Sequence, residues 1–348
     1  MAVLVAARNE EDHIGNYLRG LMDQDYPREK YSVVVVDDNS TDKTADVVER
    51  MIKGQSSFRL IRLSGHPSDI SPKINALNFA IKETSSKIIL TTDADSVVGP
   101  SWISSMLRLF DEQVGVVSGV TLFLPAKGVS RLLYEFQSID FFSQTACGAG
   151  AIGQGMVNNC NGSNMGFRRS AFEEVGGYSS IARVNSGSDS LLAQRIVETT
   201  PWQMRFAFEP SSLVRSLPPA SWGQLLQQRM RWAGQTPKYR LSTLIFLIAS
   251  FILYLFLFFS IPLSVALWPR LPAPLVVLAA KLAIDYTIIT KFRKLTRISE
   301  MKGFFFISEI IHFPVILIAA FGSFFGSFDW KGRTMEREIS QRTHHESQ

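Results

Sequence analysis

Two carboxylates stand close together directly after a strongly apolar segment. The run Ile88–Thr92 leads into Asp93, Ala94 and Asp95, and such a short β-branched and aliphatic run predicts a buried strand of a parallel sheet. Side chains two residues apart on an extended chain point to the same side, so Asp93 and Asp95 can converge on one ligand. At the carboxyl edge of an open α/β sheet, such oxygen pairs suit a divalent cation with a phosphate-bearing ligand. The alternative is a turn with solvated carboxylates.

The elements that must position these carboxylates alternate along the chain. Strands are expected at residues 2–7, 31–36, 58–63 and 87–92. Helices are expected at residues 12–22 and 43–52 and from residue 72 onward. This alternation predicts an α/β fold, a mostly parallel sheet with helices on both faces. Glu10, Asp38 and Asp95 each follow a strand, which places them on one rim, whereas Asp37 is expected to support its loop and not to bind a ligand.

Four motifs occur in a fixed order in this region. They are Val-Ala-Ala-Arg-Asn-Glu at 5–10, Val-Val-Asp-Asp-Asn-Ser-Thr-Asp at 35–42, Pro-Lys-Ile-Asn-Ala-Leu-Asn at 72–78 and Thr-Asp-Ala-Asp at 92–95. Together they resemble the nucleotide-sugar half of family 2 glycosyltransferases with the GT-A fold, over roughly residues 2–240. The resemblance implies that the chain is an enzyme that uses a nucleotide-diphospho-sugar.

The resemblance also implies roles for individual residues. Glu10 and Asp38 would hold the uridine, Lys73 would face the diphosphate, and Asp93 would lie near the ribose. Asp95 would coordinate Mg²⁺ or Mn²⁺. A bound cation stabilises the charge that develops on a departing nucleoside diphosphate, so the chemistry agrees with this assignment.

For the segments between residues 114 and 164 the sequence predicts mainly secondary structure. Residues 114–121 are predicted to form a strand, and the amphipathic stretch 129–145 a helix that packs on the sheet or lies on the membrane. The glycine-rich stretch 148–155 is expected to be a hinge or loop, because it lacks the spacing of a phosphate cradle. In enzymes of similar sequence the segment Asn161–Asn164 underlies the acceptor site; alternatively, its residues only form turns.

Two later segments complete the expected site. Ser188-Asp189 begins a helix where family members usually carry Glu-Asp, so the resemblance implies that Asp189 is the general base, although Ser188 departs from the pattern. A carboxylate at a helix start is also an ordinary cap. Residues 228–232 match the Gln-x-x-Arg-Trp signature of membrane-embedded glycosyltransferases, which include enzymes resembling cellulose, hyaluronan and poly-N-acetylglucosamine synthases and ceramide glucosyltransferase.

The signature residues have chemistry that fits a site at a membrane. Gln228 and Arg231 share one helix face, Arg231 can pair with a diphosphate, and Trp232 offers an aromatic wall for an acceptor sugar or lipid. A basic, aromatic helix near a bilayer would look similar for purely interfacial reasons. The position of the signature, just before the first long apolar run, favours the functional interpretation.

Composition divides the chain into three parts. Residues 1–240 are predicted to form the GT-A catalytic domain, residues 241–330 a membrane region with two to three apolar helices, and residues 331–348 a polar tail. The net charge is +5, and its basic residues cluster near the apolar segments, which favours an anionic membrane surface and argues against nucleic acid. The chain has only 2 cysteines, too few for a disulfide framework, so a reducing, cytosolic setting is expected for the catalytic domain.

The apolar part contains three candidate spans. Residues 244–267 can cross a bilayer, and residues 272–290 form a second candidate in which Lys281 and Asp285 are expected to neutralise each other. The third run, 303–328, includes Glu309, His312 and Pro314, and its polar groups are expected to face protein or an acceptor channel.

The orientation of the third run is ambiguous in the sequence. The basic stretch 291–302 should be cytosolic by the positive-inside rule. Three full crossings would then place the tail outside, although Lys331, Arg333 and Arg337 favour the inside. Either the third run is re-entrant or interfacial, broken at Pro314, or the charge rule is overridden. Related enzymes often carry one or two transmembrane helices before the first strand, and this chain begins on that strand.

The preferred hypothesis is an inverting glycosyltransferase that is integral to the inner or plasma membrane. It would move a sugar from a nucleotide-diphospho-sugar, with UDP-sugar as the expected donor, to a lipid-linked or polysaccharide acceptor, with a metal ion and Asp189 as base. Single transfer to a lipid and processive synthesis of a polysaccharide both stay open. The alternative is a membrane-anchored sugar-nucleotide-binding protein without turnover.

Overall fold

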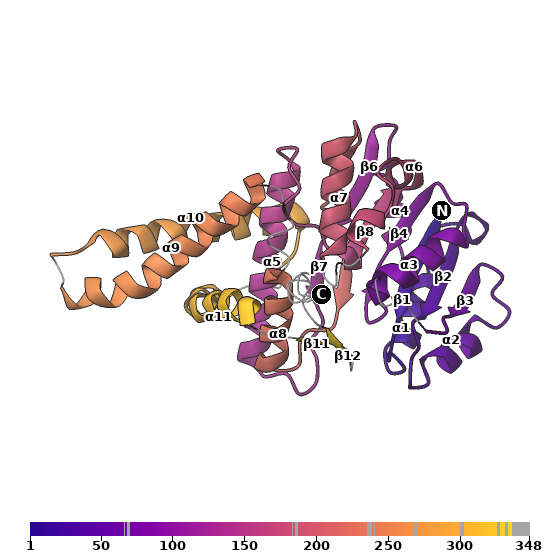
Figure 1. Ribbon diagram of the computed structural model, residues 1–348, viewed down its shortest axis with the longest axis horizontal. Coiled ribbons are helices and arrows are strands. Elements are labelled where there is room, and N and C mark those ends of the chain that lie inside the picture. Colours follow the sequence, from indigo (N-terminus) through magenta and orange to yellow (C-terminus); the bar gives the residue numbers. More distant parts are fainter. Residues whose placement is uncertain are drawn as a thin grey trace, which may run out of the picture.

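A mixed sheet of seven strands forms the centre of the N-terminal part (Figure 1). The computed structural model describes residues 1–65, 67, 70–182, 184, 187–234, 239, 241–267, 270–299, 303–325, 328–330 and 333–335. The strands, in their order across the sheet, are β3 (Phe58–Arg62), β2 (Ser32–Asp37), β1 (Ala2–Ala7), β4 (Ile88–Thr91), β8 (Met165–Arg168), β6 (Val114–Gly119) and β9 (Gln203–Ala207). Only β8 runs antiparallel to its neighbours in this sheet, so the predicted mostly parallel α/β fold is confirmed.

Helices cover both faces of the sheet because its inner strands carry apolar side chains on both faces. In β1, Ala2 and Leu4 belong to one buried cluster and Val3 and Val5 to the other. The first cluster is covered by α3 (Pro72–Lys82), α6 (Arg169–Glu174) and α7 (Ser188–Thr199). The second is covered by α1 (Ile14–Met22), α2 (Thr44–Ile52) and α4 (Trp102–Leu107). Alternate side chains of a strand point to opposite faces, and a doubly covered sheet buries both sets.

A small second sheet joins the predicted strand region 114–121 to the end of the N-terminal part. The expected strand is interrupted at Val120, so β6 belongs to the large sheet and β7 (Thr121–Phe123) to the small one. In the small sheet β10 (Val214–Ser216) pairs with β7 on one side and with β5 (Val97–Val98) on the other. Short 3-10 turns complete this part. They are η1 (Arg28–Lys30), η2 (Gly162–Asn164), η3 (Ser179–Ile181) and η4 (Pro210–Ser212).

The long helix α5 (Arg131–Ile152) connects the sheet to the apolar helices. Phe142 packs with Val120 of the sheet region and Phe292 of the apolar region in one buried cluster, which confirms that this helix packs in the core. The predicted loop at residues 148–155 is wrong in its first half, because α5 continues through Gly148 and Gly150. A Cβ at Gly148 would lie 3.1 Å from the carbonyl oxygen of Asn159, a tight contact that glycine avoids.

Three helices in the C-terminal part are long and apolar enough to cross a membrane. They are α9 (Leu241–Ala266), α10 (Ala273–Thr296) and α11 (Phe305–Phe325). Helices α9 and α10 lie side by side and extend away from the sheet (Figure 1). Lys281 of α10 pairs with Asp285 at 2.9 Å, as predicted, and also with Glu309 of α11.

Helix α11 runs unbroken through Pro314 to Phe325, so the alternative of a third run broken at Pro314 is not observed. It leaves the α9–α10 pair and lies beside α5 and α8 (Trp222–Ala233) (Figure 1). It is followed by a hairpin of β11 (Phe328–Trp330) and β12 (Arg333–Met335), so the start of the predicted polar tail forms a strand. The rest of the tail, with Lys331 and Arg337, lies outside the described residues.

Candidate active site

The loops after β1, β2 and β4 meet at one edge of the sheet because these three strands are parallel neighbours. Glu10 and Asp38 follow β1 and β2 and are buried, with 4% and 3% exposed. Asp93 and Asp95 follow β4 and are partly buried. The structure thus places all four predicted acidic residues at the carboxyl edge, where open α/β sheets bind ligands.

The first two of these loops hold each other in place. The Arg8 guanidinium donates from Nη1 to the carbonyl oxygens of Asp38 (2.8 Å) and Asn39 (2.7 Å). Asn9 and Asn39 adopt left-handed backbone conformations, with φ of 51° and 55°, a region that Asn tolerates better than most residues. Asp37 is the last residue of β2 and is buried, a position consistent with its predicted supporting role.

A group of opposite charges forms where α3 and α7 begin. The Lys73 ammonium lies 3.0 Å from Asp93 Oδ1 and 3.7 Å from Asp189 Oδ2. Burial alone would lower the pKa of Lys73, but Asp189 and Asp93 raise it above its ordinary value, so the ammonium keeps its charge. The Asp93 side chain is 43% exposed, so this group is open to a ligand on one side.

Arg231 of α8 contributes a second cation to this group. Burial lowers the pKa of its guanidinium to about 10, and the negative charges of Asp93 and Asp189 act against that shift. We call Lys73, Asp93, Asp189 and Arg231 the charge centre. Its four members come from α3, the loop after β4, α7 and α8. These segments are up to about 160 residues apart in the sequence, so only the fold brings them together.

Asp189 is seated against the backbone of Gly162. It stands in the first turn of α7, and a Cβ on Gly162 would lie 1.9 Å from Asp189 Oδ2. The Gly162 carbonyl accepts a hydrogen bond from Thr91 Oγ1 at 3.3 Å, which ties this contact to the end of β4. The role of Gly162 could not be read from the sequence, where Asn-Gly-Ser-Asn looks like an ordinary turn.

Sequence reasoning also missed two neighbours of Asp189, namely Ser190 and Tyr239. Ser190 Oγ donates to the Cys160 carbonyl at 3.1 Å and accepts from the Cys160 amide at 2.9 Å. Burial raises the pKa of the Cys160 thiol to about 12, so this cysteine is a neutral, inert packing residue. Tyr239 hydrogen-bonds Ser190, while its burial and the nearby charge of Asp189 raise its pKa.

The segment Asn161–Asn164 only partly fits the predicted acceptor role. Asn164 is fully buried; its Oδ1 accepts from Trp102 Nε1 at 3.0 Å, and its Nδ2 donates to the carbonyls of Val120 and Ser212 at 2.8 and 2.9 Å. A direct contact between Asn164 and a sugar is therefore wrong. A buried amide with all these bonds fixes the join between the two sheets.

Asp95 can take part in holding a divalent cation. Ser216 Oγ donates to Asp95 Oδ1 at 3.3 Å, whereas Asp93, two residues away, pairs with Lys73. The expected extended backbone through Asp93 and Asp95 is wrong, because β4 ends at Thr91 and Ala94 and Asp95 lie in a turn. Among the described residues no group of three or more His, Cys, Asp or Glu side chains could hold a metal. Mg²⁺ is commonly held by one or two carboxylates together with substrate phosphates and water, so the residues present fit a cation that binds with its ligand.

The remaining signature residues surround Arg229, which the sequence interpretation passed over. Arg229 Nη1 donates to Gln228 Oε1 at 2.7 Å, and its guanidinium lies 4.3 Å from the centre of the Trp232 ring. The Trp232 ring also lies 6.0 Å from that of Phe141. Arg231 therefore belongs to the charge centre, whereas Gln228 and Trp232 are held by Arg229.

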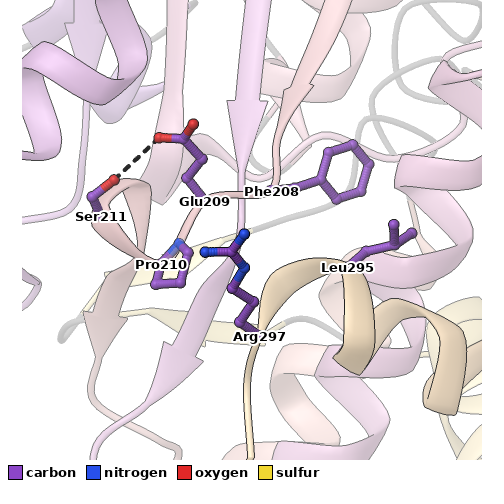
Figure 2. Close-up of a pocket in the computed structure, with 6 residues that line it drawn as sticks. All are labelled: Phe208, Glu209, Pro210, Ser211, Leu295 and Arg297. Atoms are coloured by element: carbon purple, nitrogen blue, oxygen red, sulfur yellow. Dashed lines mark hydrogen bonds between the residues drawn. The ribbon is translucent and has the colours of Figure 1, made fainter.

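A separate cavity of about 440 Å³ lies where the N-terminal part meets the end of α10 (Figure 2). Phe208, Glu209, Pro210 and Ser211 line one side, and Leu295 and Arg297 the other. Ser211 Oγ donates to Glu209 Oε2 at 3.3 Å, and Glu209 also pairs with Arg108 outside the cavity at 2.9 Å. None of the residues predicted for the site lines this cavity.

The sequence of nearly the whole chain matches one family of known proteins. Residues 10–342 match the family described as glycosyl transferase family 21. The chain belongs to this family. It is therefore an enzyme, a glycosyltransferase, and the family 2-like glycosyltransferase predicted from the four motifs is confirmed at this level.

Individual relatives of this glycosyltransferase agree with the assignment. The beta-monoglucosyldiacylglycerol synthase of Nostoc sp. is 28% identical over 237 residues, 67% of this chain and 48% of the relative. The poly-beta-1,6-N-acetyl-D-glucosamine synthase of Staphylococcus aureus is 28% identical over 238 residues, 66% of this chain and 53% of the relative. The matched part of this glycosyltransferase thus spans about half the length of these curated relatives.

A solved structure supports the fold. The mannosyltransferase PcManGT from Pyrobaculum calidifontis, solved with GDP-Man and Mn²⁺, superposes with a TM-score of 0.59 at 20% sequence identity. The match covers 93% of this glycosyltransferase and 86% of the mannosyltransferase. The expected GT-A-like fold is confirmed in this way, together with the apolar helices of the C-terminal part.

Proposed function

We propose that the chain is a membrane-bound, inverting glycosyltransferase that moves a sugar from a UDP-sugar to a lipid-linked or glycan acceptor. The observation that carries the proposal is the charge centre. It joins a carboxylate fit to act as a base, Asp189, to two cations fit to bind a diphosphate, Lys73 and Arg231, at the ligand-binding edge of the sheet. A transferase that displaces a nucleoside diphosphate needs both functions within reach of one sugar.

In this proposal Asp189 acts on the acceptor. Its carboxylate accepts the proton of the acceptor hydroxyl, and the hydroxyl oxygen attacks the anomeric carbon from the face opposite the diphosphate. The bond from the anomeric carbon to the phosphate oxygen breaks, and the diphosphate leaves with the electron pair. Positioned bases typically contribute about 10²–10⁴ in rate.

Lys73 and Arg231 act on the leaving group. Lys73 is paired with Asp93 and Asp189, and a diphosphate that attracts the ammonium would leave Asp189 able to accept a proton. Donor binding would thus prepare the base. Asp95, with Asp93 beside it, would hold a Mg²⁺ or Mn²⁺ ion, which neutralises diphosphate charge when it is bound. Glu10 and Asp38 at the same edge would hold the uridine.

Membrane attachment follows from α9 and α10. Their apolar surfaces are largely exposed, with Phe259 at 68% and Val276 at 64%, and exposure on this scale requires a lipid environment. The basic end of α10, with Lys291, Arg293 and Lys294, lies at the N-terminal part, since Phe292 packs on Phe142. By the positive-inside rule, the catalytic domain is then cytosolic.

Helix α11 fits best along the membrane surface and not across it. Phe305 at its start and Val315 at its middle pack in clusters that include α5 side chains. Towards its end, Gly322 lies against Met230 of α8. A helix that touches the catalytic domain along its whole length cannot also leave it to cross the bilayer, so the chain after α11 stays on the cytosolic side.

The acceptor side of the proposal rests on the relatives and on this membrane placement. The Nostoc relative is named for a glucosyldiacylglycerol and the Staphylococcus relative for a polysaccharide, so lipid and glycan acceptors are both retained. Trp232, next to Arg231, would contact the acceptor.

The test is a donor screen on purified protein in lipid nanodiscs. UDP-glucose, UDP-N-acetylglucosamine and GDP-mannose are each incubated with membrane lipid extract and MnCl₂, and products are identified by mass. We expect a glycosylated lipid or glycan with one UDP-sugar, loss of turnover in excess EDTA, and a kcat about 10²–10⁴-fold lower for Asp189→Asn at unchanged UDP affinity. UDP-sugar binding without any transfer would instead support a sugar-nucleotide-binding protein, and full turnover by Asp189→Asn would refute the base assignment.

A further inference from the structure

A second charged group lies beneath the signature helix, on its far side from the charge centre. Asp140 of α5 accepts from Arg229 of α8 at Oδ2, with Arg229 Nε at 2.9 Å, and from His312 of α11 at Oδ1, with His312 Nδ1 at 3.1 Å. The side chains of Asp140 and Arg229 are 2% and 7% exposed, and that of His312 is partly buried, with 23% exposed. We call Asp140, Arg229 and His312 the buried triad.

The negative charge of Asp140 is stabilised by the other two members of the buried triad. Burial would raise the pKa of Asp140, but Arg229 and His312 together hold it well below its ordinary value, so the carboxylate stays ionised. A buried ion pair of this kind contributes little net stability compared with apolar packing, while it fixes geometry sharply. Its three members come from three helices, and the fixed geometry is therefore the relative placement of α5, α8 and α11.

The geometry that the triad fixes is that of the signature residues. Arg229 donates to Gln228 and lies over the Trp232 ring, and Arg231 follows two residues later in the charge centre. A second contact clamps the same helix. Gly322 of α11 lies so close to Met230 that a Cβ would be 2.4 Å from its Sδ. Helix α11 therefore contacts α8 directly at Met230 and reaches Arg229 through Asp140 of α5.

His312 is itself held by the apolar helices. Its ring lies 5.2 Å from that of Tyr254 on α9, and Lys281 of α10 lies 5.1 Å from the same Tyr254 ring. The chain of contacts thus runs from the lipid-facing helices through His312 and Asp140 to Arg229. These contacts connect α11 to Arg229, in addition to the direct contact between Gly322 and Met230.

We propose that the buried triad positions the signature helix, and that His312, on an apolar helix, acts on the active site through Asp140 and Arg229. The inference rests on the proposed function, because it assigns Arg231 a role in transfer. His312 is a positioning residue and does not touch the substrate. The third apolar helix is by this account a part of the catalytic architecture and not only an anchor.

The test compares two replacements of His312 in the full chain in nanodiscs. His312→Asn keeps a donor near the Nδ1 position, and His312→Leu removes it. We expect His312→Leu to lower kcat by about 10–100-fold, as small misplacements of catalytic groups do, with KM and the Kd for UDP within about twofold. His312→Asn should return kcat to within about threefold of the unchanged protein. The control is Ile310→Leu, at a side chain that is 71% exposed on the same helix.

A double replacement separates positioning from stability. Asp140→Leu with Arg229→Met removes both buried charges, and such exchanges often leave a protein folded. We expect a folded protein whose kcat stays low, because Gln228 and Trp232 have lost Arg229. Recovery of kcat in this variant would overturn the proposal, as would equal kcat values for His312→Asn and His312→Leu.

Hydrogen exchange tests the positioning role of the triad even if no UDP-sugar is turned over. Absence of turnover would defeat only the proposed function. Amides of α8 (Trp222–Ala233) should exchange faster in His312→Leu than in His312→Asn, with Ile310→Leu unchanged. Equal exchange in α8 for both His312 variants would show that the triad does not hold this helix and would overturn the inference.

Discussion

Helix α8 presents two arginines, Arg229 and Arg231, to two charged groups of opposite character. Arg231 belongs to the charge centre, where the Lys73 and Asp93 side chains are 30% and 43% exposed. Arg229 belongs to the buried triad, where it and Asp140 are 7% and 2% exposed. The first group can exchange its partners for a ligand, whereas the second is closed and can only hold its shape. One helix thus carries an arginine that can bind a ligand, Arg231, and an arginine that holds the structure, Arg229.

The largest expected effect is a contrast between these two arginines. Arg229→Met leaves the Asp140 carboxylate buried without its main partner, which should cost about 3–5 kcal/mol of stability and lower the melting temperature. Arg231→Met removes a cation that burial already disfavours, so stability should change by less than about 1 kcal/mol. Its kcat should fall about 10²–10³-fold, because a donor to the leaving group is lost.

Melting curves and transfer rates on the same two preparations check this contrast. A melting temperature for Arg231→Met as low as that of Arg229→Met would break the division between an arginine that can bind a ligand and one that holds the structure.

The next effect concerns the seat of Asp189. Gly162→Ala would place a Cβ 1.9 Å from Asp189 Oδ2, so the carboxylate must move, and a displacement of about 1 Å costs on the order of 10²-fold in kcat. The matched control is Gly150→Ala in α5, where a Cβ meets nothing within 4 Å. The control should transfer sugar normally and gain slightly in stability. Equal kcat values for both variants would mean that Gly162 does not seat the base.

A smaller effect separates the groups by pH. Asp140 has a pKa below its ordinary value in the folded protein, so its pairing stabilises the fold above the unfolded pKa of about 3.9. This stabilisation is lost as the pH falls below that value. We expect the melting temperature to drop between about pH 5 and pH 3, and to drop less steeply in Asp140→Asn, which is less stable at neutral pH. Parallel curves for the two proteins would contradict the role given to Asp140.

The charge centre and the buried triad also differ in how far the sequence predicts them. Lys73, Asp93 and Asp95 stand in local motifs at strand ends and helix starts, and the parallel neighbours β1, β2 and β4 bring such ends together. Asp189 and Arg231 were named from motifs as well, and the fold brings them to Lys73 and Asp93. The alternation of strands and helices predicts that sheet, since periodicity reports which faces are buried.

The buried triad has no local signal. Asp140 looks like a polar residue on an amphipathic helix, His312 like an interruption in an apolar run, and Arg229 like a variable position inside the signature. Their meeting depends on how α11 packs, which no local pattern in the sequence reports, and Pro314 is accommodated within that helix. Gly162 was missed for a related reason, since its contact with Asp189 joins segments 27 residues apart in number.

The smallest expected effect tests whether the buried triad is closed. Gln144 Nε2 donates to Asp140 Oδ2 at 3.1 Å from one turn further along α5. This oxygen already accepts from Arg229, so Gln144→Leu should cost only about 1 kcal/mol, partly offset by the high helix propensity of Leu. Transfer should be unchanged. Gln144→Glu should destabilise more, because it sets a second negative charge beside Asp140. A loss in Gln144→Leu as large as that in Arg229→Met would show that Arg229 and His312 do not satisfy Asp140 by themselves, and the division between an open and a closed group would have to be redrawn around α5.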